Sequence, residues 1–532
     1  MNSDRLSLTI KKIVMTKYIL YSTILAASLL GGTGCSKTFL DKENQNELSG
    51  SSFWKTREQA LQAITAAYAS LQAADGSKWT WFEETYVASE YKTDEMMNNK
   101  AEGYGKPLQS FTYTTDESSF TNLWHMCFAG INRANQCIEN IPQVSGNAQN
   151  GLSDADKASL VAEAKFLRAY FYMLLQNYFT NIPLVTVTPK SNAEFYPGPA
   201  TEAEIWAQVE SDLQEGISQL PETRSDLEKG RVTKYTAQAY LGKAQLFQEK
   251  FSEANTAFAA VINSGKYQLL ANYEDNFNGL QENGAESLFE IQFSADRTNG
   301  NDERTPMPWE VSAYALNGWE LFYPSEWLAA ELKKDKRTDG GYSDRVYGTM
   351  FFDDPLSKAP VVDQPGVVKS YAEVENDLNH PIYFKKYTTP TDLADNGSYT
   401  GININLMRYA DVLLMQAEAL NEGGQTSEAI DLVNQVRTRS KAEALATMSQ
   451  DALRQQIRHH ERPCELAMEY GIRWADLYRW SRSKTSPEKI KTIMTGHNHE
   501  FANNYIDGKH DIYPVPLSEI NKNPNSRQAQ NW

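Results

Sequence analysis

Two stretches near the carboxyl end, residues 406–420 and 461–480, constrain the fold of this chain most strongly. In each, apolar residues recur at three- and four-residue steps, so the spacing predicts two helices. Charged residues of alternating sign are set into the same apolar faces, where they can pair along one helix or across to the other. A solvent-exposed helix has no need of Trp474, Tyr478 and Trp480 within such a run. We therefore predict a packed, partly buried ion network made by Arg408, Asp411, Glu418, Glu461, Arg462, Glu465, Glu469, Arg473 and Asp476.

The remaining periodicity predicts a mostly α-helical protein built from helix pairs. Residues 243–248 are followed by a helical pattern at 253–262, and residues 417–420 by one at 428–436, with apolar residues at matching offsets. This pairing is similar to a tetratricopeptide arrangement, although the copies are too divergent to define a fixed period. Residues 279–404 are rich in Gly, Pro, Asn, Asp and aromatic residues, which predicts long ordered loops with a few short strands.

Residues 1–34 have the organisation of a secretion signal. Lysines precede an apolar run at residues 18–30, which is too short to span a bilayer comfortably, and small residues follow it. Because the small residues stand directly before Cys35, we predict a lipoprotein signal with lipidation at Cys35. An ordinary secretory signal with an incidental cysteine is the alternative, and Met15 is an alternative start. The polar residues 35–52 then form a lipid tether.

Several segments resemble the SusD/RagB family, the surface lipoproteins of Bacteroidetes nutrient-uptake systems. Residues 408–419 (RYADVLLMQAEA) are similar to the family's R-Y-A-D-x-L-L-x-x-A-E-A helix, and residues 461–480 to its E-R-x-x-E-L-x-x-E-G-x-R-W-x-D-L-x-R-W helix. The chain departs from the second pattern at Pro463, which removes one helical N–H and is expected to kink or restart the helix, and at Tyr470. Matching segments extend from Cys35 to the closing Gln-Asn-Trp.

This resemblance implies a SusD-like fold, in which helix pairs support an irregular, loop-rich half that faces the ligand. It implies a signal peptide at 1–34, the tether at 35–52, an N-terminal helical region at 53–278 and a C-terminal region at 279–532. It also implies an outer-membrane lipoprotein at the cell surface that binds an oligosaccharide and delivers it to a SusC-like TonB-dependent transporter, without a cofactor. The RagB-type members imply an alternative ligand, a peptide or another nutrient.

Three aromatic clusters are candidates for the ligand site, because flat rings stack on the C–H faces of sugars while amides bond to their hydroxyls. The second cluster follows residues 93–95, which resemble the element before the sugar-contacting loop of family members. The third lies in the irregular region, together with Tyr314 and Tyr323. For each tryptophan, core packing is the competing interpretation. The candidates are Trp79 and Trp81 in the first cluster, Asn98, Asn99 and Tyr104 in the second, and Trp309 and Trp319 in the third.

The charge and the remaining motifs argue against other functions. A net charge of −17 repels a phosphate backbone, so we expect no nucleic acid partner. Glu461, Glu465 and Glu469 could be paired glycosidase carboxylates, but the interleaved arginines hold them ionised, so a hydrolase is the weakest alternative. His497 and His499 form an H-x-H pair in a polar loop without evident supporting residues, so we expect no metal site. Taken together, these observations lead us to expect no enzyme activity.

Overall fold

The structure is a computed structural model, and it describes residues 53–72, 85–99, 105–146, 150–295, 304–364, 366–388 and 400–532. The chain divides into two compact units, Met1–Trp54 and Lys55–Trp532, and the second unit is described below. The predictions on the signal peptide, Cys35 and the tether fall outside the described residues. No helix in the described ranges is both long enough and apolar enough to cross a membrane.

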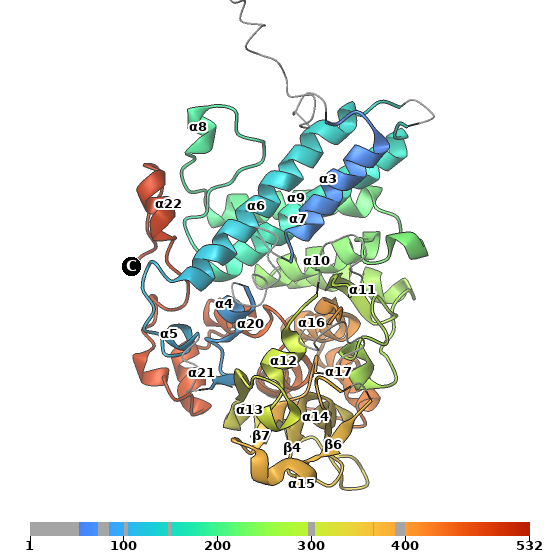
Figure 1. The fold of residues 1–532 in the computed structure, drawn as a ribbon, viewed down its shortest axis with the longest axis vertical. Coiled ribbons are helices and arrows are strands. Elements are labelled where there is room, and N and C mark those ends of the chain that lie inside the picture. The colour runs from blue at the N-terminus through green and yellow to red at the C-terminus, as the bar shows by residue number, and fades with distance from the viewer. Residues whose placement is uncertain are drawn as a thin grey trace, which may run out of the picture. The chain divides into compact units, whose positions relative to one another are not determined.

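The long helices of the described part form a series in which each helix packs on the next (Figure 1). They are α3 (Arg57–Ala69), α6 (Ser118–Asn140), α7 (Asp154–Tyr178), α9 (Glu202–Gln219), α10 (Lys234–Phe247), α11 (Phe251–Asn263), α16 (Tyr409–Glu422) and α17 (Thr426–Arg439). The irregular region separates α11 from α16 in sequence, yet these two helices pack directly together. The irregular region is therefore an insertion into one helical stack. This arrangement confirms the predicted mostly α-helical fold built from tetratricopeptide-like helix pairs.

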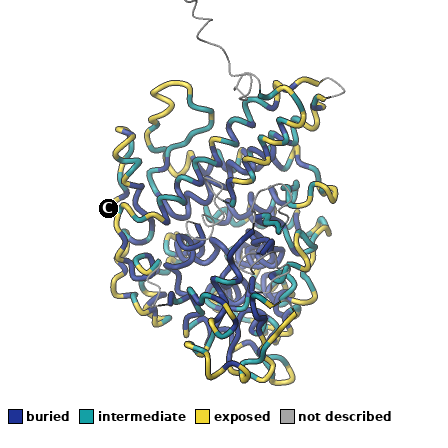
Figure 2. Tube along the Cα trace, viewed as in Figure 1, coloured by how far each residue is buried: buried dark blue, intermediate teal, exposed yellow. Residues whose placement is uncertain are grey.

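Capping residues fix where several of these helices begin. The side chains of Thr56 and Thr201 accept a hydrogen bond from the backbone N–H three residues on, while Gln59 and Glu204 accept one from the threonine N–H. Ser153 caps α7 in a similar way. These contacts satisfy backbone donors that the first helical turn leaves unpaired. Figure 2 shows the interior that results, with α16 buried along almost its entire length.

The strands of the described residues pair two by two into separate antiparallel ribbons. The pairs are β1 (Met96–Asn98) with β3 (Phe322–Pro324), β2 (Ser287–Ile291) with β8 (Ile404–Arg408), β4 (Met350–Phe352) with β7 (Ile382–Phe384), and β5 (Lys358–Pro360) with β6 (Val368–Ser370). The β2–β8 ribbon leads directly into α16 and so attaches the inserted region to the stack. A small core that includes Phe351 and Tyr383 lies within this region.

Shorter helices complete the chain. Those of the N-terminal part are α4 (Val87–Glu90), α5 (Lys106–Gln109) and α8 (Asn192–Phe195). Those of the inserted region are α12 (Met307–Val311), α13 (Glu326–Leu332), α14 (Asp344–Thr349) and α15 (Tyr371–Val374). Those of the C-terminal part are α18 (Gln450–Gln456), the π-helical turn Ile457–Glu461, α19 (Arg462–Leu466), α20 (Arg473–Ser481), α21 (Ile490–Gly496) and α22 (Leu517–Lys522).

The two predicted carboxyl-terminal helices differ from the structure at their ends. Residues 406–408 belong to β8 and pair with β2, so the first helix begins only at Tyr409. The second stretch is not one helix, because a turn with positive φ at Met468 and Gly471 separates α19 from α20. Pro463 stands in the first turn of α19, which continues directly from the π-helical turn Ile457–Glu461, so the helix changes type beside the proline instead of starting there.

Candidate functional site

Two of the three predicted aromatic clusters meet around β3. Asn98 lies in β1, which pairs with β3, and the Asn99 N–H donates to the Leu321 carbonyl at 2.8 Å. The Trp319 N–H donates to the Trp309 carbonyl at 2.6 Å. The rings of Trp309 and Trp319 are 5.7 Å apart between centroids and inclined by 65°, an edge-to-face contact. We refer to these two residues as the tryptophan pair.

The tryptophan pair is held by the tight loop that connects α12 to β3. Gly318 approaches Ser312 so closely that a Cβ atom at position 318 would lie 2.1 Å from the Ser312 carbonyl oxygen. Asn317 and Glu320 adopt left-handed φ angles of 65° and 53°. The Glu320 N–H closes the loop by donating to the Ser312 carbonyl at 2.9 Å. Only glycine fits at position 318, so the backbone itself sets the geometry of the pair.

Several aromatic rings of this region are at least partly exposed. The tryptophan pair is half-buried, and Tyr314 on the same loop is 44% exposed. Tyr323 of β3 stacks on His380 with 3.8 Å between ring centroids. The side chains of Asn98 and Asn99 are buried, with 5% and 7% of their surface exposed. The rings, rather than these two amides, are therefore the groups that a ligand from solution meets first.

The other predicted ligand residues, Trp79, Trp81 and Tyr104, lie outside the described residues. Their part in a ligand site stays a prediction, and so does lipidation at Cys35.

Buried acids fasten the segment that leads into β1 to the carboxyl-terminal region. Asp94 accepts hydrogen bonds from Nε and Nη2 of Arg473, both at 2.7 Å, and lies 2.6 Å from Nδ1 of His497. Burial opposes ionisation of Asp94, but Arg473 and His497 outweigh it and hold the pKa of Asp94 well below its ordinary value. Glu95 accepts from the Met468 N–H at 3.2 Å, and burial raises the pKa of Glu95 to about 8.

Lys92 adds a second attachment in the same segment. Its ammonium group lies 3.6 Å from the ring centroid of Trp474 and 3.8 Å from that of Tyr513, and it has no hydrogen-bond partner among the described residues. Burial lowers the pKa of Lys92 well below its ordinary value. Trp474 belongs to α20, and Tyr513 lies in the segment after α21. The contacts of Lys92 with these two rings therefore attach the segment before β1 to both places in the C-terminal region.

The carboxylates and arginines of the predicted ion network lie in direct contact. Arg408 contacts Glu286 at 2.5 Å, Glu465 at 3.1 Å and Glu469 at 2.6 Å. Lys386 contacts Glu469 at 2.9 Å. All these groups are buried rather than only partly buried, so each ion is compensated within the protein instead of by water.

A second group of the network joins α16 to α19 and α20. Arg462 contacts Asp411 at 2.7 Å and Asp476 at 2.6 Å, and Arg479 contacts Glu418 at 2.6 Å. Burial opposes ionisation of Glu418, but Arg479 outweighs it and lowers the pKa of Glu418 to about 2. These contacts cross between helices, as the alternating signs of the sequence predict.

The three glutamates considered for hydrolysis have no open approach. Glu461 contacts Arg345 at 3.0 Å and Arg437 at 2.6 Å, and the surfaces of Glu461, Glu465 and Glu469 are 0%, 0% and 2% exposed. Burial opposes ionisation of Glu461 and Glu469, yet nearby cations outweigh it and lower the pKa of both. A glycosidase instead needs one carboxyl with a raised pKa that faces the substrate.

His497, one of the two histidines considered for metal binding, has protein partners. His497 bonds to Asp94, and its ring stacks on Trp327 with 3.7 Å between centroids. Within the described ranges, one other group brings potential ligands together, namely Asp335, His460 and Cys464. Asp335 is already ion-paired with Arg345 and with Arg437, so arginines supply the positive charge there.

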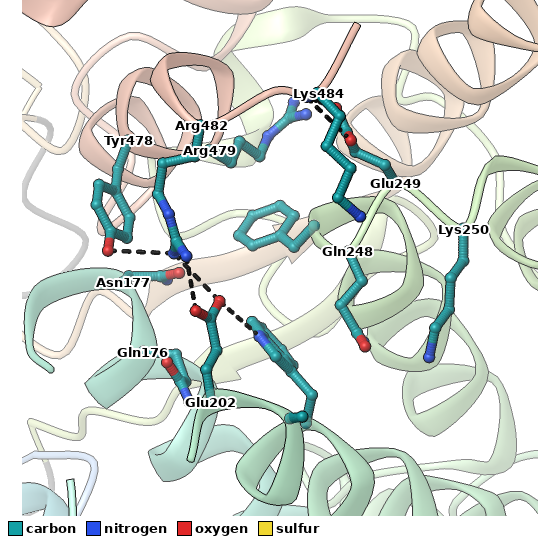
Figure 3. Close-up of a pocket in the computed structure, with 13 residues that line it drawn as sticks. Gln176, Asn177, Glu202, Gln248, Glu249, Lys250, Tyr478, Arg479, Arg482 and Lys484 are labelled. Carbon is teal, nitrogen blue, oxygen red and sulfur yellow. Dashed lines mark hydrogen bonds and ion pairs between the residues drawn. The ribbon is translucent and has the colours of Figure 1, made fainter. Parts of the chain in front are cut away.

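A cleft that the sequence did not indicate lies between the end of α7, the start of α9, the α10–α11 turn and α20 (Figure 3). Its volume is about 460 Å³. An ion pair between Arg482 and Glu202, at 2.6 Å, joins two of its walls. Its residues come from four segments far apart in the chain, so no local pattern marks it.

Together these features define a class of protein, a stack of paired helices with an inserted region that presents a loop-built aromatic surface. The family model described as the SusD family matches residues 285–532. A second model, described as starch-binding associating with outer membrane, matches residues 38–246. The chain belongs to the SusD/RagB family.

Individual relatives agree with this assignment. SusD-like protein P38 of Formosa agariphila is 27% identical over 504 residues, which cover 87% of this chain and 91% of that protein. A SusD superfamily protein of Bacteroides vulgatus has a similar fold, with a TM-score of 0.78 and 24% identity over 90% of this chain and 100% of that one. A laminarin-binding SusD-like protein superposes with a TM-score of 0.70 and 23% identity over 90% and 100% of the two chains. The protein is thus a member of a SusD-like, carbohydrate-binding family associated with the outer membrane.

Proposed function

We propose that this protein is a cell-surface lipoprotein that captures an oligosaccharide and delivers it to a SusC-like TonB-dependent transporter in the outer membrane. The observation that carries the proposal is the tryptophan pair, two half-buried rings in edge-to-face contact at a tight loop in which Gly318 packs against Ser312. Aromatic faces of this kind pack on the C–H faces of pyranose rings, while neighbouring polar groups bond to hydroxyls.

The rest of the chain supports capture at that surface. The tryptophan pair lies on the inserted region, and the helical stack and the buried ion network hold that region in place. The buried segment from Lys92 to Glu95 fixes β1 and Asn99 beside the pair. In the proposed working protein, residues 1–34 are removed, Cys35 carries the lipid and residues 35–52 form the tether. The body, with its helical region 53–278 and C-terminal region 279–532, then opens and closes over the transporter.

Calorimetric titration tests the ligand class. The mature protein is titrated with laminarin, amylopectin and a panel of other soluble oligosaccharides, and separately with a peptide mixture. We expect binding to at least one saccharide, and at least about a fivefold weaker affinity for Trp309→Ala and Trp319→Ala, since each ring contributes about 1–3 kcal/mol. Phe195→Ala, which removes a ring that is 57% exposed on α8, is the matched control and keeps full affinity. If the protein binds peptides and no saccharide, the proposed ligand is a peptide instead of an oligosaccharide, which is the alternative that the RagB-type members imply.

Two further measurements test the anchor and the partner. Cys35→Ser is expected to lose incorporation of labelled palmitate and to leave the membrane fraction. Affinity purification of the lipidated protein from outer membranes is expected to recover a TonB-dependent transporter. If the protein is purified without a TonB-dependent transporter, the proposed delivery step is contradicted. The proposed saccharide binding is tested by the titration alone.

A further inference from the structure

The cleft between α9 and α20 has the lining of a ligand site. Its volume of about 460 Å³ lies within the range of roughly 300–1,000 Å³ found for small-molecule sites. Three aromatic residues line it, Trp206, Phe247 and Tyr478, together with polar side chains from each wall (Figure 3). The cleft belongs to the helical stack, whereas the tryptophan pair belongs to the inserted region.

Two adjacent amides at the end of α7 open onto this cleft. Gln176 and Asn177 both line it, and they are 7% and 9% exposed. Nε2 of Gln176 is buried and has no hydrogen-bond partner among the described residues. An unsatisfied buried donor costs free energy, so its persistence at the wall of a cleft points to a partner that is not part of the folded chain.

Most of the cations that line the cleft are already paired with acids. Arg482 pairs with Glu202 at 2.6 Å, and the Glu202 carboxylate also accepts from Nε1 of Trp206 at 3.3 Å. Lys484 and Glu249, which Figure 3 shows on the opposite wall, add one charge of each sign. The lining also holds Lys250 and Arg479, which pair with Glu210 and Glu418 outside it, so three of its four cations already have an acidic partner and donors and acceptors occur together. This suits a neutral polyol, whose hydroxyls both donate and accept, better than an anion or a cation.

We propose that this cleft is a second saccharide-binding site, separate from the tryptophan pair, that takes a neutral unit of one or two sugar rings. The sugar packs against the aromatic residues of the cleft, and its hydroxyls bond to the Gln176 and Asn177 amides on one wall and to Lys484 on the other. Two sites on one surface protein raise the local concentration of a long glycan, because an end that dissociates from one site stays held at the other.

Fluorine NMR of the mature protein labelled with 5-fluorotryptophan tests this site. The Trp206 signal is assigned with Trp206→Phe, and the probes are glucose, galactose, mannose, maltose, cellobiose and laminaribiose. We expect at least one probe to shift the Trp206 signal with a Kd on the order of 1–10 mM. Asn177→Ala and Lys484→Met should each weaken that Kd by about fivefold, the loss of one hydrogen bond.

Controls separate this site from the other. Lys522→Met, which removes an exposed lysine from α22, leaves the Kd measured at Trp206 unchanged. Trp309→Ala also leaves it unchanged, even if it abolishes binding at the tryptophan pair, so the two proposals fail independently. The inference is overturned if no probe shifts the Trp206 signal at about 100 mM, well above the affinities of weak sugar sites. It is equally overturned if the shift persists in both cleft variants, or if only acetate or a peptide produces it.

Discussion

Replacing Arg408 by methionine probes the buried ion network at its centre. Arg408 is 1% exposed and contacts Glu286, Glu465 and Glu469. Methionine fills most of the same space, but it leaves three buried carboxylates with fewer cations beside them. Removing one partner from a buried ion pair costs about 3–5 kcal/mol, because an uncompensated charge stays in the interior. Since folded domains are stable by only about 5–15 kcal/mol, Arg408→Met should lower the free energy of unfolding by a large fraction of its value.

Urea unfolding followed by tryptophan fluorescence measures this loss. Arg482→Met is the matched control, because Arg482 and its partner Glu202 are 47% and 46% exposed, and exposed pairs contribute about 0–1 kcal/mol. The double variant Arg408→Met/Glu469→Gln should lose less stability than the sum of its two single variants, since the second change removes a carboxylate that the first leaves uncompensated. Equal losses for Arg408→Met and Arg482→Met would refute the reasoning, and so would simple additivity of the double variant.

Three further predictions concern Glu95, Gly318 and the buried cysteines. Burial raises the pKa of Glu95 to about 8, so from about pH 4.5 to 8 the folded protein keeps a proton that the unfolded chain releases, and stability falls as the pH rises. Between pH values of about 5 and 9, Glu95→Gln should therefore lose less free energy of unfolding than the unchanged protein, and equal losses in urea titrations contradict this. Gly318→Ala places a Cβ 2.1 Å from a carbonyl oxygen, so it should lower the melting temperature and weaken oligosaccharide binding about tenfold; unchanged values of both contradict the account of the loop. Burial raises the pKa of three thiols, so Ellman's reagent should modify them only after denaturation, and reaction in the folded state is the contrary result. These thiols are Cys127, Cys137 and Cys464.

Local sequence rules were accurate wherever the determinants lie within a few residues of one another. The helical spacing at residues 253–262 and 428–436 predicts α11 and α17 correctly, because the residues that set it are near neighbours in sequence. The same rules were wrong at residues 406–408, because pairing with β2 overrides helical spacing there. Arg408 and Glu286, which end in contact, are 122 residues apart. No periodicity carries information over such a separation.

The candidate site shows the same limit. Residue type was enough to single out Trp309 and Trp319, but their junction with Asn99 depends on the β1–β3 pairing, which no local pattern encodes. His497 was considered as a metal ligand because of its H-x-H pattern, and its partner Asp94 lies 403 residues away, so no local pattern indicates their contact. The cleft could not be predicted from the sequence either, because its residues Glu202 and Arg482 are 280 residues apart.

The division of the strands into separate ribbons has a consequence for the history of such proteins. Because the strands of the described part pair only two by two, a change in one ribbon does not propagate through a continuous sheet. A loop that carries rings can then lengthen, shorten or exchange its side chains while the helical frame folds as before. Substitutions in a few surface segments can therefore change the ligand specificity of such a chain while its helical fold is retained.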